Sequence, residues 1–133
     1  MMVSYFLLKA SKIQPSQLYL NAAKLAKVKE LYKPILLDSL PPIPIKELDN
    51  EIIFTDGHHR AYIAVSLGFE NLPVYWETEN LSWNLYRVCV GWCKEENITT
   101  ILDLKKKIVK NTEFKKLWIK KCADLRKKMK ISN

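Results

Sequence analysis

The stretch that most constrains this chain is a strand, turn and helix pattern at residues 52–68. An apolar, β-prone run ends at Thr55, and five polar or turn-forming residues, 56–60, follow it. Apolar residues then recur at intervals of three and four, which is typical of a helix, and Gly68 stands where such a helix would end. We therefore predict a strand and a helix that are joined by a tight turn, and this turn carries both histidines of the sequence.

The turn has the residue types that bind an anion. The first backbone N–H groups of a helix have no intrahelical partner, and the helix dipole favours negative charge there. Gly57 permits a sharp turn and the close approach of a ligand to the main chain. Arg60 falls in the first helical turn, where its guanidinium can hold a phosphate with two hydrogen bonds. The predicted phosphate-binding residues are Thr55, Gly57, His58, His59 and Arg60.

A plainer interpretation of the same residues stays open. Asp56 would then serve only as a cap for the helix, and Arg60 would pair with a nearby carboxylate. The concentration of two histidines, an arginine, an aspartate and a glycine within five residues favours a functional site over this alternative.

The same residues resemble the signature of the ParB/sulfiredoxin-like superfamily. The matching segment runs from Asp56 to Ala61 and is closed by Leu67-Gly68, with weaker similarity at residues 42–45 and 72–75. The resemblance covers roughly residues 5–78. It implies an α+β fold, in which a small mixed sheet packs against helices and the turn holds nucleotide phosphates.

Three branches of that superfamily imply different chemistry. Sulfiredoxins place a catalytic cysteine directly after the glycine, where this chain has His58, so reduction of cysteine sulfinic acid is not expected. Partition proteins carry an arginine-bearing motif after the first strand, where this chain has residues 14–17, Gln-Pro-Ser-Gln. Free-serine kinases have a closely similar Asp-Gly-His turn, but Gln17 lies near the position of their glutamate base, and an amide cannot take a proton from a hydroxyl.

The resemblance therefore implies a nucleotide-binding protein that could act as a phosphotransferase on a small hydroxyl compound. Backbone N–H groups of the turn and the Arg60 side chain would hold the phosphates of ATP, ADP or CTP. His58 or His59 would neutralise charge in the transition state, and Asp56 would bind Mg²⁺ or orient a histidine. Asp56, His58 and His59 are thus the catalytic candidates, and Asp56 is the metal candidate.

The competing hypothesis is a non-catalytic adaptor of the nucleic-acid-binding or partition type. The net charge is +8, and residues 105–130 hold twelve basic residues against two acidic ones. Such a segment is either a solvated helix face or a contact surface for DNA or RNA. The candidate contact residues are Lys116, Lys120, Lys121 and Lys127. Phe114 and Trp118 fall on the apolar stripe of this helix, so they are expected in the core and not as stacking platforms for bases.

Length and composition fit one domain without a membrane partner. A chain of 133 residues with 48% hydrophobic content can bury a core, and no apolar run approaches the ~20 residues of a membrane span. The first eight residues lack the charged start and cleavage site of a signal peptide, so a cytoplasmic protein is expected. Cys89, Cys93 and Cys122 lack paired spacing and are expected as buried free thiols.

The remaining pattern predicts the other elements. Residues 3–9 are expected to form a strand covered on both faces, and Asn21 is expected to cap a helix that ends before Pro34. A hairpin is expected at 43–48 and 51–55 around Asp49-Asn50, followed by a strand at 73–78. Helices are expected at 82–97, after Thr100 with Ile108 inside it, and after Asn111 or Thr112. Residues 1–80 would form the nucleotide-binding core, and 81–133 a helical extension packed on it.

Overall fold

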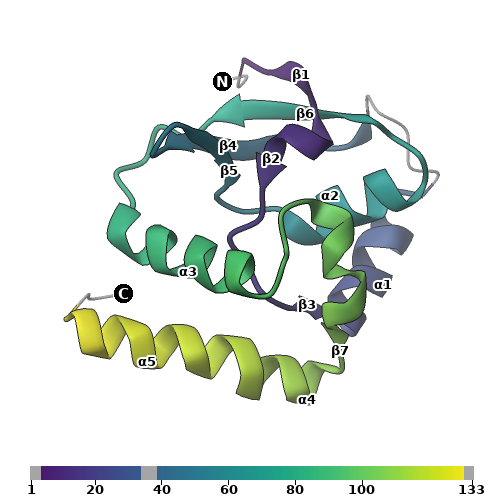
Figure 1. Cartoon of the computed structure of the whole chain (residues 1–133). Helices are drawn as coiled ribbons and strands as arrows, with labels where there is room; N and C mark the ends of the chain where they lie inside the picture. Colours follow the sequence, from purple (N-terminus) through teal and green to yellow (C-terminus); the bar gives the residue numbers. More distant parts are fainter. Residues whose placement is uncertain (1–3, 34–38, 131–133) are drawn as a thin grey trace.

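The computed structural model describes residues 4–33 and 39–130, and it combines helices with a mixed sheet (Figure 1). The five-stranded sheet has the order β1-β6-β4-β5-β2, and a second sheet pairs two short strands, β3 and β7. The strands are β1 (Phe6–Lys9), β2 (Ile13–Gln14), β3 (Leu20–Asn21), β4 (Ile43–Leu48), β5 (Glu51–Phe54), β6 (Asn71–Trp76) and β7 (Ile108–Val109). The predicted α+β class is confirmed.

The β4–β5 hairpin delivers the candidate site. Asp49 and Asn50 have φ values of 52° and 66°, as a two-residue turn of type I′ requires, so the predicted hairpin is confirmed. The antiparallel register pairs Leu48 with Glu51 and Ile45 with Phe54. Strand β4 also pairs in parallel with β6, and β5 with β2, so the hairpin lies in the middle of the sheet. The turn that follows Phe54 therefore starts from a fixed strand end.

Two helices flank this turn. Helix α1 (Ala22–Leu31) begins after Asn21, whose Oδ1 accepts hydrogen bonds from the backbone N–H groups of Ala23 at 3.0 Å and Lys24 at 3.4 Å. The predicted cap is thus confirmed, while Pro34 lies outside the described residues. Helix α2 (His58–Ser66) follows the turn directly; Leu67 is its C-cap and precedes Gly68, which has a φ of 104°. Both helix boundaries therefore match the signals in the sequence.

The C-terminal half is helical, and its helices lie below the sheet in Figure 1. It contains α3 (Trp83–Glu95), a 3₁₀ helix η3 (Ile101–Lys107), and a last helix made of α4 (Asn111–Phe114), a π-helical segment η4 (Lys115–Ile119) and α5 (Lys120–Met129). One face of α3 joins the main core through Leu85, Cys89 and Cys93. A second face packs Val90 against Leu48 and Ile53. Helix α3 is therefore apolar on two sides, as in a helix that is buried between layers.

Three predictions about the elements are wrong. Strand β1 is not covered on both faces, because it lies at the sheet edge, where the side chains of Tyr5 and Leu7 are 53% and 51% exposed. Ile108 does not lie in the short helix, since it pairs with Leu20 in the second sheet. The last helix is capped by neither Asn111 nor Thr112: Lys110 precedes its first turn, and no side chain caps it. Residue 3 of the expected first strand lies outside the described residues.

The division at residue 80 stays a prediction, but the core spans it. One cluster of buried side chains contains Ile13, Leu20 and Phe54 together with Cys93 and Trp118. In residues 4–33 and 39–130, no helix combines the length and apolar character needed to cross a membrane.

Candidate functional site

Gly57 sets the shape of the turn. It has left-handed backbone angles, φ 74° and ψ 21°, and it is the N-cap of α2. A β-carbon at this position would lie 2.9 Å from Nη2 of Arg60 and 3.1 Å from Cγ2 of Ile43. Only glycine fits both the angles and the space, because other residues disfavour positive φ and would displace the guanidinium.

The start of α2 has no side-chain cap. Oδ1 of Asp56 accepts a hydrogen bond from the backbone N–H of Gly57 at 2.7 Å, which lies before the helix. No side chain of the described residues bonds the backbone N–H groups of the first helical turn. Asp56 therefore stabilises the turn, but it does not bond the first backbone N–H groups of α2. These are the groups that bind anions at the helix starts of other proteins.

Arg60 is held over the turn by main-chain carbonyl oxygens. Its Nη1 donates to the oxygen of Pro41 at 3.2 Å and, more weakly, to that of Pro42 at 3.5 Å. Among the ion pairs of the described residues none includes Arg60, so the alternative in which it pairs with a carboxylate does not hold there. Carbonyl oxygens orient a guanidinium without neutralising its charge, so Arg60 keeps its positive charge beside Gly57.

Both histidines are buried, and each accepts a hydrogen bond from a distant part of the backbone. The N–H of Ser16 donates to Nε2 of His58 at 3.0 Å, and the N–H of Asn21 donates to Nε2 of His59 at 2.9 Å. Because Nε2 is the acceptor, the neutral ring carries its proton on Nδ1. The Nδ1 of His58 has no hydrogen-bond partner among the described residues.

The electrostatic environment keeps both rings neutral. Burial lowers the pKa of His58 to about 3, although the Asp56 carboxylate acts in the opposite direction. Burial, and then the charge of Lys24, lower the pKa of His59 to about 4. Neutralising a developing negative charge would require a protonated ring, which this arrangement disfavours. The structure instead uses His58 and His59 to attach α2 to the segment that leads into α1.

A pocket of about 260 Å³ lies between α1 and the start of α2, and we call it the α1–α2 pocket. Lys24 and Arg60 provide its positive charges, and Asp56 lines it as an exposed carboxylate. The remaining lining residues are Gln17, Val28, Leu31, Tyr32, Gly57 and His59. The pocket thus combines two cations, the turn and an apolar wall, a combination that suits a phosphate attached to a larger organic group.

Lys24 is exposed, as its position on the helix suggests, but it was not predicted as a site residue. It lies in the first turn of α1, and its charge acts on both histidine rings. Asn21 fixed the start of the helix correctly, but nothing in the sequence indicates that this turn packs beside residues 56–60. The contact is tertiary.

The predicted site residues separate into two groups. Asp56, Gly57, His59 and Arg60 share the α1–α2 pocket. His58 and Thr55 instead line a smaller pocket of about 160 Å³, which we call the α3–α5 pocket. The hydroxyl of Thr55 donates to Oε1 of Glu77 at 3.1 Å, so it is engaged away from Gly57.

Mg²⁺ would have one protein carboxylate in the α1–α2 pocket. Within residues 4–33 and 39–130, no group of three or more histidine, cysteine, aspartate or glutamate side chains could hold a metal. Asp56 is exposed, and Mg²⁺ commonly takes one or two carboxylates and completes its shell with phosphates and water. The donor set therefore fits an ion that arrives with a nucleotide, and it does not fit a permanently bound metal.

The four lysines proposed for nucleic-acid contact differ in their surroundings. Nζ of Lys120 pairs with Asp124 at 2.9 Å, and Nζ of Lys121 lies 4.2 Å from the ring centroid of Trp92. Lys116 and Lys127 are exposed on the same last helix. Phe114 and Trp118 are buried in the main core, as predicted.

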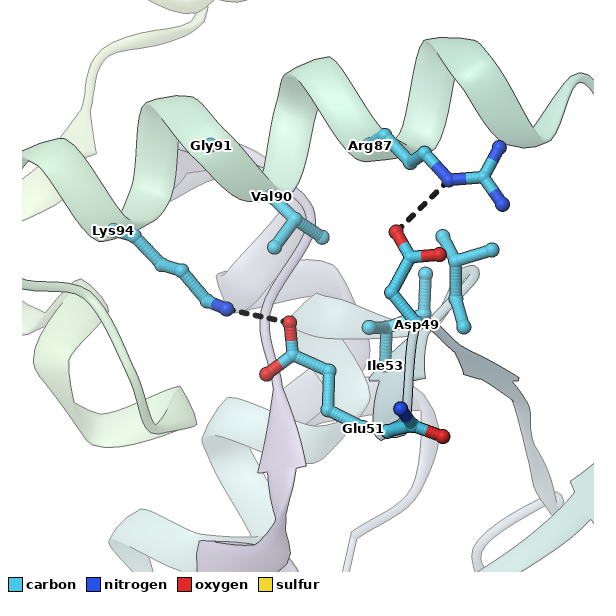
Figure 2. Close-up of a pocket in the computed structure, with 9 residues that line it drawn as sticks. Asp49, Glu51, Ile53, Arg87, Val90, Gly91 and Lys94 are labelled. Carbon is cyan, nitrogen blue, oxygen red and sulfur yellow. Dashed lines mark hydrogen bonds and ion pairs between the residues drawn. The ribbon is translucent and has the colours of Figure 1, made fainter.

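A larger pocket of about 400 Å³ lies between the β4–β5 hairpin and α3. Figure 2 shows two side chains of α3 reaching the hairpin: Arg87 pairs with Asp49 at 2.9 Å, and Lys94 pairs with Glu51 at 2.6 Å. Leu48, Ile53 and Val90 form its apolar floor. Because each cation already faces a carboxylate, this pocket holds the hairpin against α3 and has little charge left for a ligand.

We expect these ion pairs to contribute little to stability. In a double-mutant cycle of Arg87→Ala and Asp49→Asn, the coupling free energy should be below about 1 kcal/mol, since both side chains are well exposed. Asparagine keeps the left-handed turn, so the cycle measures the pair alone. Urea unfolding would give the four free energies, and a coupling above about 2 kcal/mol would show a structural role that exposure does not suggest.

Comparisons with known proteins leave the family open. No protein-family model and no curated protein matches this sequence. The crystal structure of protein Atu1540 from Agrobacterium tumefaciens is similar in part, with a TM-score of 0.46 and 11% identity. The match covers 72% of this chain and 49% of that chain, so this chain spans about half the length of that protein. At this level of similarity the match indicates neither a family nor a function.

Proposed function

We propose that this protein binds a nucleotide or another phosphate compound in the α1–α2 pocket. The observation that carries the proposal is the turn at Gly57, where the uncapped start of α2 lies under the guanidinium of Arg60. Lys24 adds a second positive charge from the first turn of α1. Backbone N–H groups, a planar guanidinium and an ammonium together are typical of phosphate recognition.

The apolar side of the pocket favours a phosphate compound over free phosphate. Val28, Leu31 and Tyr32 lie along α1 beyond Lys24 and face the same space as the turn. An aromatic ring and aliphatic side chains can cover the base of a nucleotide, while the cations hold its phosphates. ATP, ADP and CTP are therefore the first compounds to test, each with and without Mg²⁺.

Phosphotransfer to a small hydroxyl compound is the reaction that we propose for this pocket. Arg60, Lys24 and the amides of the turn would stabilise charge on the transferred phosphoryl group, which is the main requirement of such reactions. Asp56 would contribute one ligand to Mg²⁺ that enters with the phosphates. The histidines would position these groups as neutral rings through their bonds to Ser16 and Asn21.

Binding can be tested by thermal shift and then by calorimetry. A ligand that binds the folded protein alone raises its melting temperature, whatever the chemistry that follows. Arg60→Ala and Lys24→Ala should each weaken nucleotide binding roughly 10- to 100-fold, because each removes a charged hydrogen-bond donor. Arg87→Ala changes an arginine in the pocket between the β4–β5 hairpin and α3 and should leave the affinity unchanged.

The adaptor hypothesis predicts that the same variants behave differently when DNA or RNA binding is measured. DNA or RNA binding that is sensitive to salt, survives Arg60→Ala and weakens when Lys116 and Lys127 are neutralised would favour it. If neither a nucleotide nor another phosphate compound shifts the melting temperature, or if Arg60→Ala binds as tightly as the parent protein, the proposed function is wrong. Nucleotide binding without turnover of any hydroxyl compound would restrict the protein to a binding role.

A further inference from the structure

Two cysteines from different helices meet in the α3–α5 pocket. Cys89 lies on α3 and Cys122 on α5, and Figure 1 shows these two helices side by side. Both thiols are free and buried, and they lie close enough for each to shift the pKa of the other. Both also line the same pocket of about 160 Å³.

The helix spacing explains why they meet. Trp118, Cys122 and Arg126 are four residues apart, so they lie on one face of the last helix, and all three line the pocket. The ring of Trp118 packs edge-on against Trp92 of α3, with centroids 6.1 Å apart. This aromatic contact fixes α5 against α3 one turn before Cys122.

The two sulfurs have different surroundings. The interaction with the neighbouring Cys89 thiol lowers the pKa of Cys122 against the effect of burial, and the nearby charges of Arg126 and Lys121 also lower it. The same interaction and burial raise the pKa of Cys89. Burial, with the charge of Glu96, raises the pKa of the third cysteine, Cys93, to about 12. Cys122 is therefore a better nucleophile than Cys89. Cys93 serves as a control, because it is a buried cysteine of the same chain that lies outside the α3–α5 pocket.

We propose that Cys122 and Cys89 form a redox-active dithiol that hydrogen peroxide converts to a disulfide between α5 and α3. The Cys122 thiolate attacks one peroxide oxygen, the O–O bond breaks, and the leaving hydroxide takes a proton to form water. Cys122 is then a sulfenic acid. The Cys89 sulfur attacks the Cys122 sulfur, an S–S bond forms, and a second water leaves with the Cys89 proton. Two thiols lose two electrons, which reduce one peroxide to two waters.

This site is independent of the proposed nucleotide pocket, but the two are adjacent. Gln17 lines both pockets, and the adjacent residues His58 and His59 each line one of them. The disulfide would join the last helix to α3 next to the buried ring of His58. Reduction by a small thiol such as dithiothreitol restores the two free cysteines.

The test is oxidation of the folded chain followed by alkylation of the unfolded chain. After brief treatment with hydrogen peroxide, iodoacetamide in denaturant should label Cys93 alone, and mass spectrometry of peptides should show residues 89 and 122 cross-linked. Dithiothreitol before alkylation should restore labelling of all three cysteines. Cys93→Ala should form the same cross-link, while Cys89→Ala should retain a sulfenic acid at Cys122 that dimedone traps.

Three results would overturn the proposal. The first is labelling of all three cysteines after peroxide treatment. The second is oxidation of Cys122 directly to sulfinic acid without a cross-link, and the third is a disulfide between two chains or one that includes Cys93. Arg126→Gln should slow formation of the cross-link several-fold at neutral pH, and an unchanged rate would contradict the part given to that side chain.

Discussion

Lowering the pH from 7.5 to 4.5 is expected to reduce the free energy of unfolding of this protein by several kcal/mol. His58 and His59 have pKa values of about 3 and about 4 in the folded chain, below the ordinary value of 6.5. The unfolded chain therefore binds protons below pH 6.5 that the folded chain does not bind. The histidine contribution is fully present above pH 6.5 and is lost as the pH falls toward 4, by about 1.4 kcal/mol per pH unit for each ring.

Urea unfolding between pH 7.5 and 4.5 measures this effect. His58→Gln keeps an oxygen that can accept the hydrogen bond from the N–H of Ser16, but its amide does not titrate. The slope of stability against pH should fall to roughly half in this variant, and His59→Gln should remove most of the remainder. A flat profile for the parent protein between pH 6.5 and 5 would show that neither ring is held neutral.

Gly57→Ala is expected to cost about 1–2 kcal/mol of stability and to weaken binding of a phosphate compound. The positive φ of 74° alone costs an alanine about 1 kcal/mol. The new β-carbon would also lie 2.9 Å from Nη2 of Arg60 and 3.1 Å from Cγ2 of Ile43, so the guanidinium must shift within the turn and the Ile43 side chain must adjust. Urea unfolding gives the first effect, and calorimetry with the best nucleotide gives the second.

The chain supplies two matched controls for this substitution. Gly68→Ala has a positive φ of 104° but no atom within 4 Å of the new β-carbon, so it should show the backbone cost alone. Gly91→Ala lies inside α3 with open space around it, and it should stabilise the protein by about 0.5–1 kcal/mol. If Gly57→Ala cost no more stability than Gly68→Ala and bound nucleotide as tightly as the parent protein, the position of the Arg60 guanidinium would not depend on a glycine at residue 57.

Local signals in the sequence were sufficient to predict most of the helices and the hairpin. Asn21, Thr100 and Asp49-Asn50 act within a few residues of themselves, through caps and turn angles, and each was found where expected. The two-residue strands β2, β3 and β7 were not predicted, because they depend on partners far along the chain. Strand β1 was misjudged for a similar reason, since an apolar run does not show how many strands will flank it.

The candidate site was predicted in part. The sequence indicated the turn, the glycine and the arginine, because helix starts have recognisable residues. It could not separate His58 from His59, whose side chains diverge by about 100° around the helix axis and so reach different pockets. Nor could it give their partners, which lie 42 and 38 residues away. Lys24 and the carbonyl oxygens that hold Arg60 also arise from tertiary packing.

The C-terminal half of the chain is attached to the N-terminal half by hydrogen bonds as well as by packing. Asn21 donates from its amide nitrogen to Oδ1 of Asn111 at 2.8 Å, while its backbone N–H is bonded to His59. The side chain of Gln14 likewise donates to the carbonyl oxygen of Ile98 at 2.8 Å. An expression fragment that stopped at residue 80 would therefore expose apolar core residues. It would also lose the hydrogen bond between Asn111 and Asn21, the residue that caps α1. Anyone isolating the α1–α2 pocket for crystallisation or ligand screening should keep the chain through residue 130.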